Sequence, residues 1–387
     1  MTINWQEALR DVVPHVTALR RELHRHPELS GHEEKTRETL LEALRPLGCK
    51  LHEFKNCNGI MATVENGEGD CVAVRADMDA LPVCEPAGLS FASANEGVMH
   101  ACGHDVHMAL AYGCCKWLCE NRDKWQGTVK FLFEPMEETV GGGKLMVEQG
   151  CMENPDVKCV IGQHVNPRYK AGVFFAKPGF VSGSSDDLMI TVKGSQCHGA
   201  YPEQGIDAIV LSAQIVSALQ QLVSRTISPF DPAVVTIGTI NGGKANNIVC
   251  GEVVMRGTLR TMSADTRKKL QAEIVSTAEG IASAMGGSAR VDIIPSYGAV
   301  YNDDAFYSII DREAETLLGR ENMVLREAPS LGVESFCYFL DHTPGVYYDI
   351  GSGIGTALHT DTFMVDEDCL LPGVALQCAS VLALLKA

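Results

Sequence analysis

Apolar positions along the chain repeat with two periods, and each period predicts a type of element. Near the N-terminus they recur every three to four positions, which predicts one long amphipathic helix that runs to about His24. The residues on its apolar face are Ala8, Val12, Val16 and Leu19. The helix ends before Pro27, because the residue before a proline disfavours the helical backbone. A second helix is predicted over residues 33–47.

Short apolar runs then alternate with helical segments in the first half of the chain and again near its end. The predicted strands of this kind cover residues 71–76, 128–133, 157–161 and 345–350. Between the first two lies a predicted helix over residues 105–120, with Asp105 as its N-cap. Strands that are apolar along their whole length and alternate with helices are typical of an α/β fold. We therefore expect a mostly parallel sheet that is flanked by helices.

The middle of the chain has a different pattern. Its predicted strands cover residues 188–192, 234–239, 253–261 and 290–295, and several alternate as in a half-exposed sheet. Two periodic helices are predicted among them, over residues 208–223 and 266–285. This order is typical of an antiparallel sheet with two helices on one face. We therefore predict an inserted α+β domain at residues 182–296 and a main domain made of residues 1–181 and 297–387.

Composition and charge narrow the possible partners. The 387 residues include 49 acidic and 32 basic side chains, so the net charge is −17 and no nucleic-acid partner is expected. No apolar run approaches the roughly 20 residues that cross a bilayer, and the N-terminus lacks a signal-peptide pattern, so no membrane partner is expected. The 15 cysteines are an odd number and include the adjacent pair Cys114-Cys115, which favours reduced thiols and a cytoplasmic location.

Side chains that bind metal ions gather in five segments, each at the end of a predicted strand or the start of a helix. These segments are residues 75–79, 99–105, 135–138, 162–165 and 358–360. The carboxyl ends of the strands meet in one crevice of an open α/β sheet, so the segments can converge. Cys102 and His104 flank a glycine that lets both side chains turn to one side, and both types bind Zn²⁺-like ions. Taken alone, a buried cysteine beside a surface histidine is the simpler interpretation of that pair.

Two adjacent carboxylates and two separate histidines complete the candidate metal ligands. Glu137 and Glu138 follow an apolar strand, and in such a pair one carboxylate can bind a metal ion while the other acts as general base. An exposed acidic turn is the alternative interpretation. His164 and His359 follow an apolar strand and a glycine-rich loop, respectively, where a hydrogen-bonded core histidine is the commoner case.

Further polar residues fit supporting roles. Asp77 and Asp79 are two positions apart at a strand end, so they point the same way if extended and can orient a ligand histidine; a turn or cap is equally compatible. His198 lies in a loop of the inserted domain, where a surface histidine is the simpler interpretation. Arg260 can bind a carboxylate with both arms of its guanidinium, and Asn247 lies nearby in the same hairpin region. A surface arginine is the alternative.

Several motifs in the same order resemble the aminoacylase-type family of co-catalytic metallopeptidases. The specific likeness is to its branch of aminoacylases, hippurate hydrolases, auxin-conjugate hydrolases and N-acetyldiaminopimelate deacetylases, and it spans nearly the whole chain. The matching positions are residues 23–30, 75–82 and 99–104, Glu137-Glu138, His164, His198 with Pro202, Gly205 and Asp207, and residues 358–359.

The resemblance implies a site with two divalent ions and an enzyme that hydrolyses the amide bond of small N-acyl amino acids. The implied ligands are Cys102, His104, Glu138, His164 and His359. Glu137 would be the catalytic carboxylate, and the inserted domain a lid or dimerisation domain whose His198 reaches the partner's active site. Asn247 and Arg260 would hold the substrate carboxylate. The metals implied are Zn²⁺, Mn²⁺, Co²⁺ or Ni²⁺, and the assembly a homodimer or homotetramer.

Some positions depart from the usual pattern of that branch and leave the substrate open. The departures are Val106, Met108, Asn166, Glu203 and the run at residues 332–336. An N-acetyldiaminopimelate deacetylase or a dipeptidase-like hydrolase is therefore an alternative within the class. Outside it, Cys102 could be a thiol nucleophile with His104 as its base, and a non-catalytic metal-binding protein is a third hypothesis.

Overall fold

The structure is a computed structural model that describes residues 3–86, 88–353 and 355–387. The chain forms two compact units. The first unit comprises Met1–Val181, Tyr301–Ala328 and Ser335–Ala387. The second comprises Ser182–Val300 together with the short segment Pro329–Glu334. Sequence patterns placed the return to the main domain at residue 297 and did not single out the short segment.

The first unit is built on an eight-stranded sheet. From edge to edge its strands are β1 (Lys50–Glu53), β2 (Ile60–Asn66), β4 (Gly127–Glu134), β3 (Cys71–Asp77), β5 (Val157–Asn166), β14 (Gly345–Gly351), β6 (Phe174–Ala176) and β13 (Met323–Leu325). The four central strands β4, β3, β5 and β14 are parallel. Antiparallel pairs flank them on both sides, where β2 pairs with β4 and β6 with β14. The predicted mostly parallel α/β sheet is thus confirmed.

Burial explains why the central strands lack polar alternation. Every residue of β3, β4 and β14 is buried, so both faces of these strands are covered. The helices of this unit are α1 (Trp5–Ala8), α2 (Val13–Arg25), α3 (Glu34–Leu44), α4 (His104–Glu120), α5 (Gly143–Glu148), α8 (Asp304–Leu318), α9 (Cys337–Leu340) and α10 (Leu370–Leu384). Helix α4 contacts α2, α10 and the sheet. Hydrogen bonds of His104 and His107 in its first turn, to Asp79 and Asp77 and to the Val165 N–H, place that turn at the carboxyl ends of β3 and β5.

Two local predictions were wrong. The expected long N-terminal helix is two helices, because the chain turns at residues 9–12 and α2 restarts with Pro14 in its first turn, where a missing N–H does no harm. Asp105 is not the N-cap of α4, since Gly103 occupies that position. The Asp105 carboxylate is buried instead, 2.8 Å from Arg20 Nε and 2.9 Å from His24 Nδ1.

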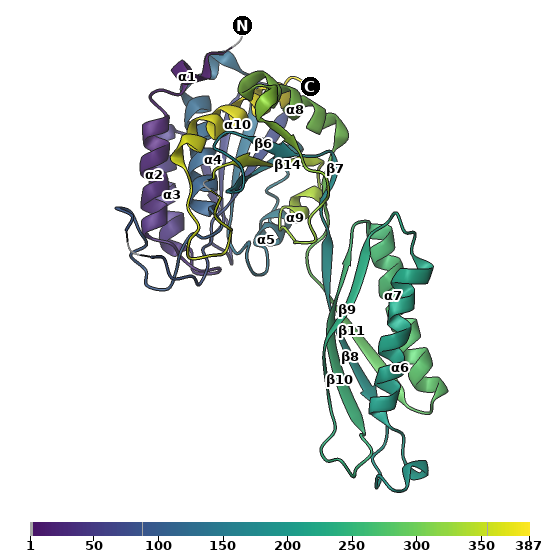
Figure 1. The fold of residues 1–387 in the computed structure, drawn as a ribbon. Coiled ribbons are helices and arrows are strands. Elements are labelled where there is room, and N and C mark those ends of the chain that lie inside the picture. The colour runs from purple at the N-terminus through teal and green to yellow at the C-terminus, as the bar shows by residue number, and fades with distance from the viewer. Residues whose placement is uncertain (1–2, 87, 354) are drawn as a thin grey trace. The chain divides into compact units, whose positions relative to one another are not determined.

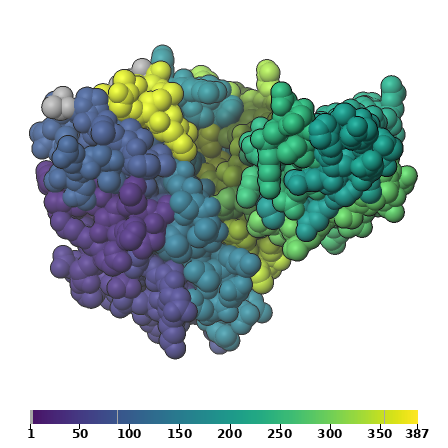
Figure 2. Space-filling model, turned by 90° about the horizontal axis from the view of Figure 1, so that it is seen from below, coloured from purple at the N-terminus to yellow at the C-terminus, as the bar shows by residue number. Residues whose placement is uncertain are grey.

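The C-terminal part of the chain completes the first unit. Residues near the C-terminus, yellow in the space-filling view, lie beside a blue segment of the N-terminal third (Figure 2). Glu367–Leu384, which includes helix α10, is apolar enough to span a membrane by length and composition, whereas no such stretch was predicted. However, 72% of that window is buried inside the structure, where α10 packs on α4 and α8, so its apolar surface forms core.

The second unit is an antiparallel sheet covered by two helices. Its strand order is β11 (Ser288–Pro295), β8 (Ser184–Lys193), β10 (Glu252–Thr261) and β9 (Ala233–Gly242). Helices α6 (Ala208–Gln221) and α7 (Ala264–Ala284) pack on each other and on one face of this sheet (Figure 1). A separate core of aliphatic side chains fills the space between helices and sheet. The predicted α+β architecture is confirmed. Two short strands whose residues lie mostly in the first unit, β7 (Gly179–Ser182) and β12 (Val300–Asn302), pair with each other.

Candidate metal centre

The start of α4 carries the first two candidate ligands. Gly103 precedes the helix with a φ of +86°, a left-handed conformation that suits glycine, and this bend brings Cys102 and His104 to the same side. His104 Nδ1 lies 2.8 Å from the carbonyl oxygen of Asp79, which identifies Nδ1 as the protonated nitrogen. His104 Nε2 is buried and has no hydrogen-bond partner among the described residues. It is therefore available to a metal ion.

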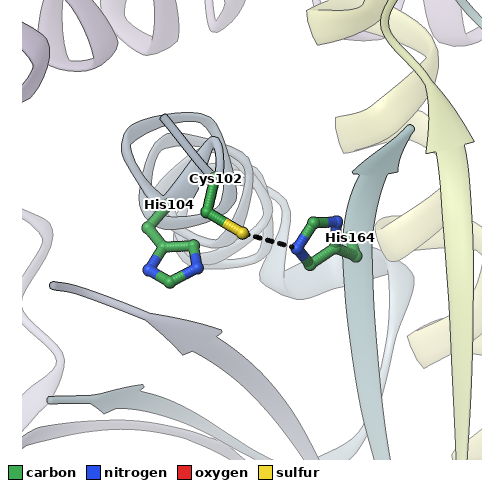
Figure 3. Close-up of side chains that lie close together, drawn as sticks. All are labelled: Cys102, His104 and His164. Carbon is green, nitrogen blue, oxygen red and sulfur yellow. Dashed lines mark hydrogen bonds between the residues drawn. The ribbon is translucent and has the colours of Figure 1, made fainter. Parts of the chain in front are cut away.

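Two more histidines reach Cys102 from distant parts of the chain. His164 lies near the carboxyl end of β5, and its Nε2 is 3.5 Å from Cys102 Sγ (Figure 3). Its Nδ1 is 2.7 Å from the Val165 carbonyl oxygen, so the nitrogen that faces the sulfur is unprotonated in the neutral ring. His359 has a φ of +61°, and its backbone N–H donates to the Ala101 carbonyl at 2.9 Å. Its Nε2 is 3.3 Å from Cys102 Sγ.

The two adjacent carboxylates lie on the turn that follows β4. Glu138 Oε1 is 3.3 Å from His359 Nε2 and 3.8 Å from His104 Nε2. One oxygen from each of Glu137 and Glu138 lies within 4.8 Å of a ring nitrogen of His104 and of each other. The turn therefore brings both carboxylates to the ligand cluster.

Asp77 and Asp79 lie behind this cluster. Asp79 Oδ1 and Oδ2 accept the backbone N–H groups of Glu137 and Glu138, both at 3.0 Å. Asp77 Oδ1 is 2.6 Å from His107 Nδ1, and the His107 Nε2 accepts the Val165 N–H at 2.9 Å, so His107 donates to Asp77. Asp79 thus holds the turn that carries the two glutamates, and Asp77 holds His107, which binds the backbone of β5 next to His164.

The donor set fits two metal ions. One group of mutually close donors is Cys102, His104 and His164, and a second is Cys102, Glu138 and His359. The Cys102 sulfur belongs to both groups, as a ligand shared by two ions would. A soft sulfur with imidazole and carboxylate donors suits borderline divalent ions. Among the residues that the structure describes, two candidate ligand atoms, His104 Nε2 and Glu138 Oε1, are buried without a hydrogen-bond partner, and such ions would satisfy both.

The electrostatics of Cys102 bear on the thiol-nucleophile hypothesis. Burial raises the pKa of the Cys102 thiol well above its usual value. A catalytic thiol needs a depressed pKa and some exposure, whereas Cys102 is only 7% exposed. A thiolate here requires a cation beside it, which favours the role of ligand over that of free nucleophile.

The remaining predicted residues lie in the second unit. His198 is exposed in the loop between β8 and α6, and it forms an isolated bridge with Ile248. The neighbouring Gly199 N–H donates to the Asn247 carbonyl at 2.7 Å, so these two loops lie side by side. Arg260 is on β10, and its Nη1 donates to the carbonyl oxygen of Leu331. Hence each of the three residues belongs to this unit, and none to the unit that carries the candidate metal ligands.

Sequence reasoning missed two supporting groups. Glu33 is fully buried and accepts the Met136 N–H at 2.9 Å, next to the catalytic carboxylate candidate. Arg75 is buried on β3, where its Nε is 2.6 Å from Glu134 and its Nη1 is 2.7 Å from Asp77. The apolar context of Arg75 was a readable signal, because a buried arginine needs paired carboxylates. Glu33 had no such signal, since it precedes an ordinary amphipathic helix.

Comparisons with known proteins agree with this geometry. Residues 73–383 match peptidase family M20/M25/M40. The chain is 36% identical to an N-acetyldiaminopimelate deacetylase of Halalkalibacterium halodurans, over 92% of this chain and 96% of the relative. It is 33% identical to an N-acetyl-L-cysteine deacetylase of Bacillus subtilis, over 91% of this chain and 84% of the relative.

A solved structure extends the likeness to the whole fold. It is a Bacillus subtilis protein described as a dinuclear metal-binding peptidase of the M20 family, with a TM-score of 0.84 and 29% identity. The match covers 97% of this chain and 99% of that one. The chain belongs to peptidase family M20/M25/M40, and it is a hydrolase that acts on amide bonds.

Proposed function

We propose that this chain hydrolyses the amide bond of N-acyl amino acids with the help of two divalent metal ions. The observation that carries the proposal is the convergence of donors from three other segments on Cys102 and His104, with Glu137 among them. The five proposed ligands are Cys102, His104, Glu138, His164 and His359. The relatives that are named deacetylases of N-acetyl amino acids support the substrate class.

Glu137 is the proposed general base. Ions held by the ligand cluster would supply Lewis acidity, which makes a water nucleophilic near neutral pH and polarises a carbonyl group. Glu137 accepts a proton from the water while the water oxygen attacks the amide carbon. Glu137 then passes this proton to the leaving nitrogen. The products are a carboxylic acid and an amine. The Asp79 carboxylate keeps the backbone of Glu137 in place during these transfers.

The second unit is proposed to bind the substrate and complete the site. Arg260 and Asn247 would hold the carboxylate of the amino-acid part and so set which bond is presented. His198, supplied by a neighbouring subunit of a homodimer or homotetramer, would donate a hydrogen bond to the oxyanion. These roles and the lid or dimerisation role of the unit rest on the resemblance of the motifs around these residues.

N-acetyldiaminopimelate is the most specific alternative substrate, because one of the two deacetylase relatives acts on it by name. Its free carboxylates and acetyl amide meet the same requirements as those of simpler acetyl amino acids. A direct comparison of rates therefore has to separate them.

The test combines metal analysis with a substrate panel. Metal content per chain is measured by mass spectrometry, and hydrolysis is assayed on N-acetyl, N-benzoyl and indole-acetyl amino acids and on N-acetyldiaminopimelate, with and without chelator. About two ions per chain and chelator-sensitive release of a free amino acid are expected. Activity that persists in the metal-free protein would contradict the metal-dependent mechanism. Metal binding without hydrolysis of any panel member would contradict the substrate class.

A further inference from the structure

Two buried carboxylates bind three consecutive backbone N–H groups at the turn that carries the proposed base. Glu33 Oε1 accepts from Met136 at 2.9 Å. Asp79 accepts from the next two residues, Glu137 and Glu138, at 3.0 Å each. Glu33 is 0% exposed and Asp79 is 1% exposed, so neither carboxylate is available to bulk water. Charge-assisted bonds of this kind are about twice as strong as those between neutral groups.

Met136 has a conformation that needs such support. Its φ is +60°, in the left-handed region that a residue with a Cβ atom seldom adopts. The Met136 carbonyl accepts the N–H groups of Thr139 and Gly141, at 3.3 and 2.8 Å, so the left-handed residue closes the turn that contains both glutamates. Strained backbone persists only where surrounding contacts over-determine it. The Met136 carbonyl bonds stay within the turn, whereas the bond from the Met136 N–H to Glu33 ties the strained residue to another part of the chain.

Glu33 is itself held in one position. Its Oε1 also accepts the Gly31 N–H at 2.9 Å, and its Oε2 accepts the Asn58 side-chain amide at 3.1 Å. Both carboxylate oxygens are therefore occupied, and the side chain cannot rotate without losing several bonds. Because it precedes α3 by one residue, the carboxylate is anchored on a regular element.

We propose that Glu33 is a positioning residue of the hydrolytic reaction. It holds Met136 in the left-handed conformation, and this directs Glu137 toward the reacting water and Glu138 toward the metal ions. The inference rests on the proposed function, which makes Glu137 the general base. It adds a residue that touches neither substrate nor metal and acts through the backbone of the turn.

The central experiment removes the carboxylate and then removes the strain. We expect Glu33→Ala to lower kcat by about 10- to 100-fold, as loss of a group that orients a catalytic residue does, with KM and metal content nearly unchanged. Met136→Gly in the Glu33→Ala background restores part of kcat, because glycine adopts a φ of +60° without steric cost. Glu33→Gln loses much less than Glu33→Ala, since its carbonyl oxygen still accepts both backbone N–H groups while the Asn58 amide rotates. Glu34→Ala, one residue away and exposed, is the matched control.

A second readout is independent of activity. Hydrogen exchange of a peptide that covers residues 134–142 is expected to be faster in Glu33→Ala than in the wild type, and close to wild type in Glu33→Gln. If Glu33→Ala does not fold, Glu33→Asp keeps the charge, is one methylene too short to reach Met136, and carries the same expectation. Unchanged exchange and unchanged kcat in these variants would overturn the proposal. So would a loss of kcat that Met136→Gly leaves unrestored, because that points to a general structural role.

The design separates this proposal from the assignment of the base. If Glu137→Gln retains wild-type kcat, Glu137 is not the base and the proposed function fails. Faster exchange at residues 134–142 in Glu33→Ala would then still support the backbone contact, whereas the catalytic part of the inference would be overturned. If Glu137→Gln is inactive but Glu33→Ala is fully active, only the positioning role is refuted.

Discussion

Replacing Gly103 with alanine tests how the chain brings two candidate ligands to one side. Gly103 has a φ of +86°, and a Cβ atom there would lie 2.3 Å from Val165 Cγ2. The left-handed conformation costs a residue with a side chain about 1–2 kcal/mol. The overlap costs a further 1–3 kcal/mol or so, because Val165 is stiff at χ1 and its backbone N–H is bound to His107. We therefore expect Gly103→Ala to destabilise the first unit by about 2–5 kcal/mol.

Urea unfolding followed by tryptophan fluorescence measures this cost in the first unit, because Trp5, Trp117 and Trp125 all lie there. Gly48→Ala is the matched control: Gly48 has a φ of +72°, and its added Cβ would meet nothing within 4 Å, so only the conformational part of about 1–2 kcal/mol is expected. Equal losses in the two variants would refute the argument from the contact with Val165. If Gly103→Ala lowers the free energy of unfolding by less than about 1 kcal/mol and leaves metal binding unchanged, both the conformational cost and the cost of the overlap with Val165 are refuted.

Three further predictions follow from the site and its surroundings. Glu137→Gln should keep the bound metals and lower kcat by about 10²- to 10⁴-fold; full activity would contradict its role as base. Arg260→Ala should raise KM by about 10- to 100-fold for acyl amino acids but not for neutral amides, and equal effects on both would count against the carboxylate clamp. Burial lowers the pKa of His24, but the charge and hydrogen bond of Asp105 and the hydrogen bond of Glu85 have the larger effect and raise this pKa to about 9. The protonated His24 therefore stabilises the folded state fully below about pH 6.5, and this contribution is lost as the pH rises through about 9. Urea unfolding at several pH values measures it, and a His24→Gln variant that keeps the same pH dependence would contradict the assignment of this effect to His24.

Local patterns in the sequence were sufficient for most regular elements. Apolar periodicity depends only on neighbouring residues, so β3, β4, β14 and both helices of the second unit were predicted close to their observed bounds. Strand β5 runs five residues beyond its predicted end, to Asn166, so His164 lies within the strand and not after it. One prediction failed because a polar side chain had two possible partners. Asp105 had the chemistry of an N-cap, but the charges of Arg20 and His24 lie within 3 Å of it in the folded chain and bind its carboxylate instead.

The sequence by itself determined the donor types of the candidate site and the order of the motifs that identify the family. It also indicated where the donors converge, because the carboxyl ends of parallel strands must meet at one edge of a sheet. Only the tertiary structure decided how the donors are held. Glu33 and the Met136 N–H are 103 positions apart and form a bond between a side chain and the backbone. Such a bond has no period or residue preference in the sequence, since every residue except proline offers the same N–H group.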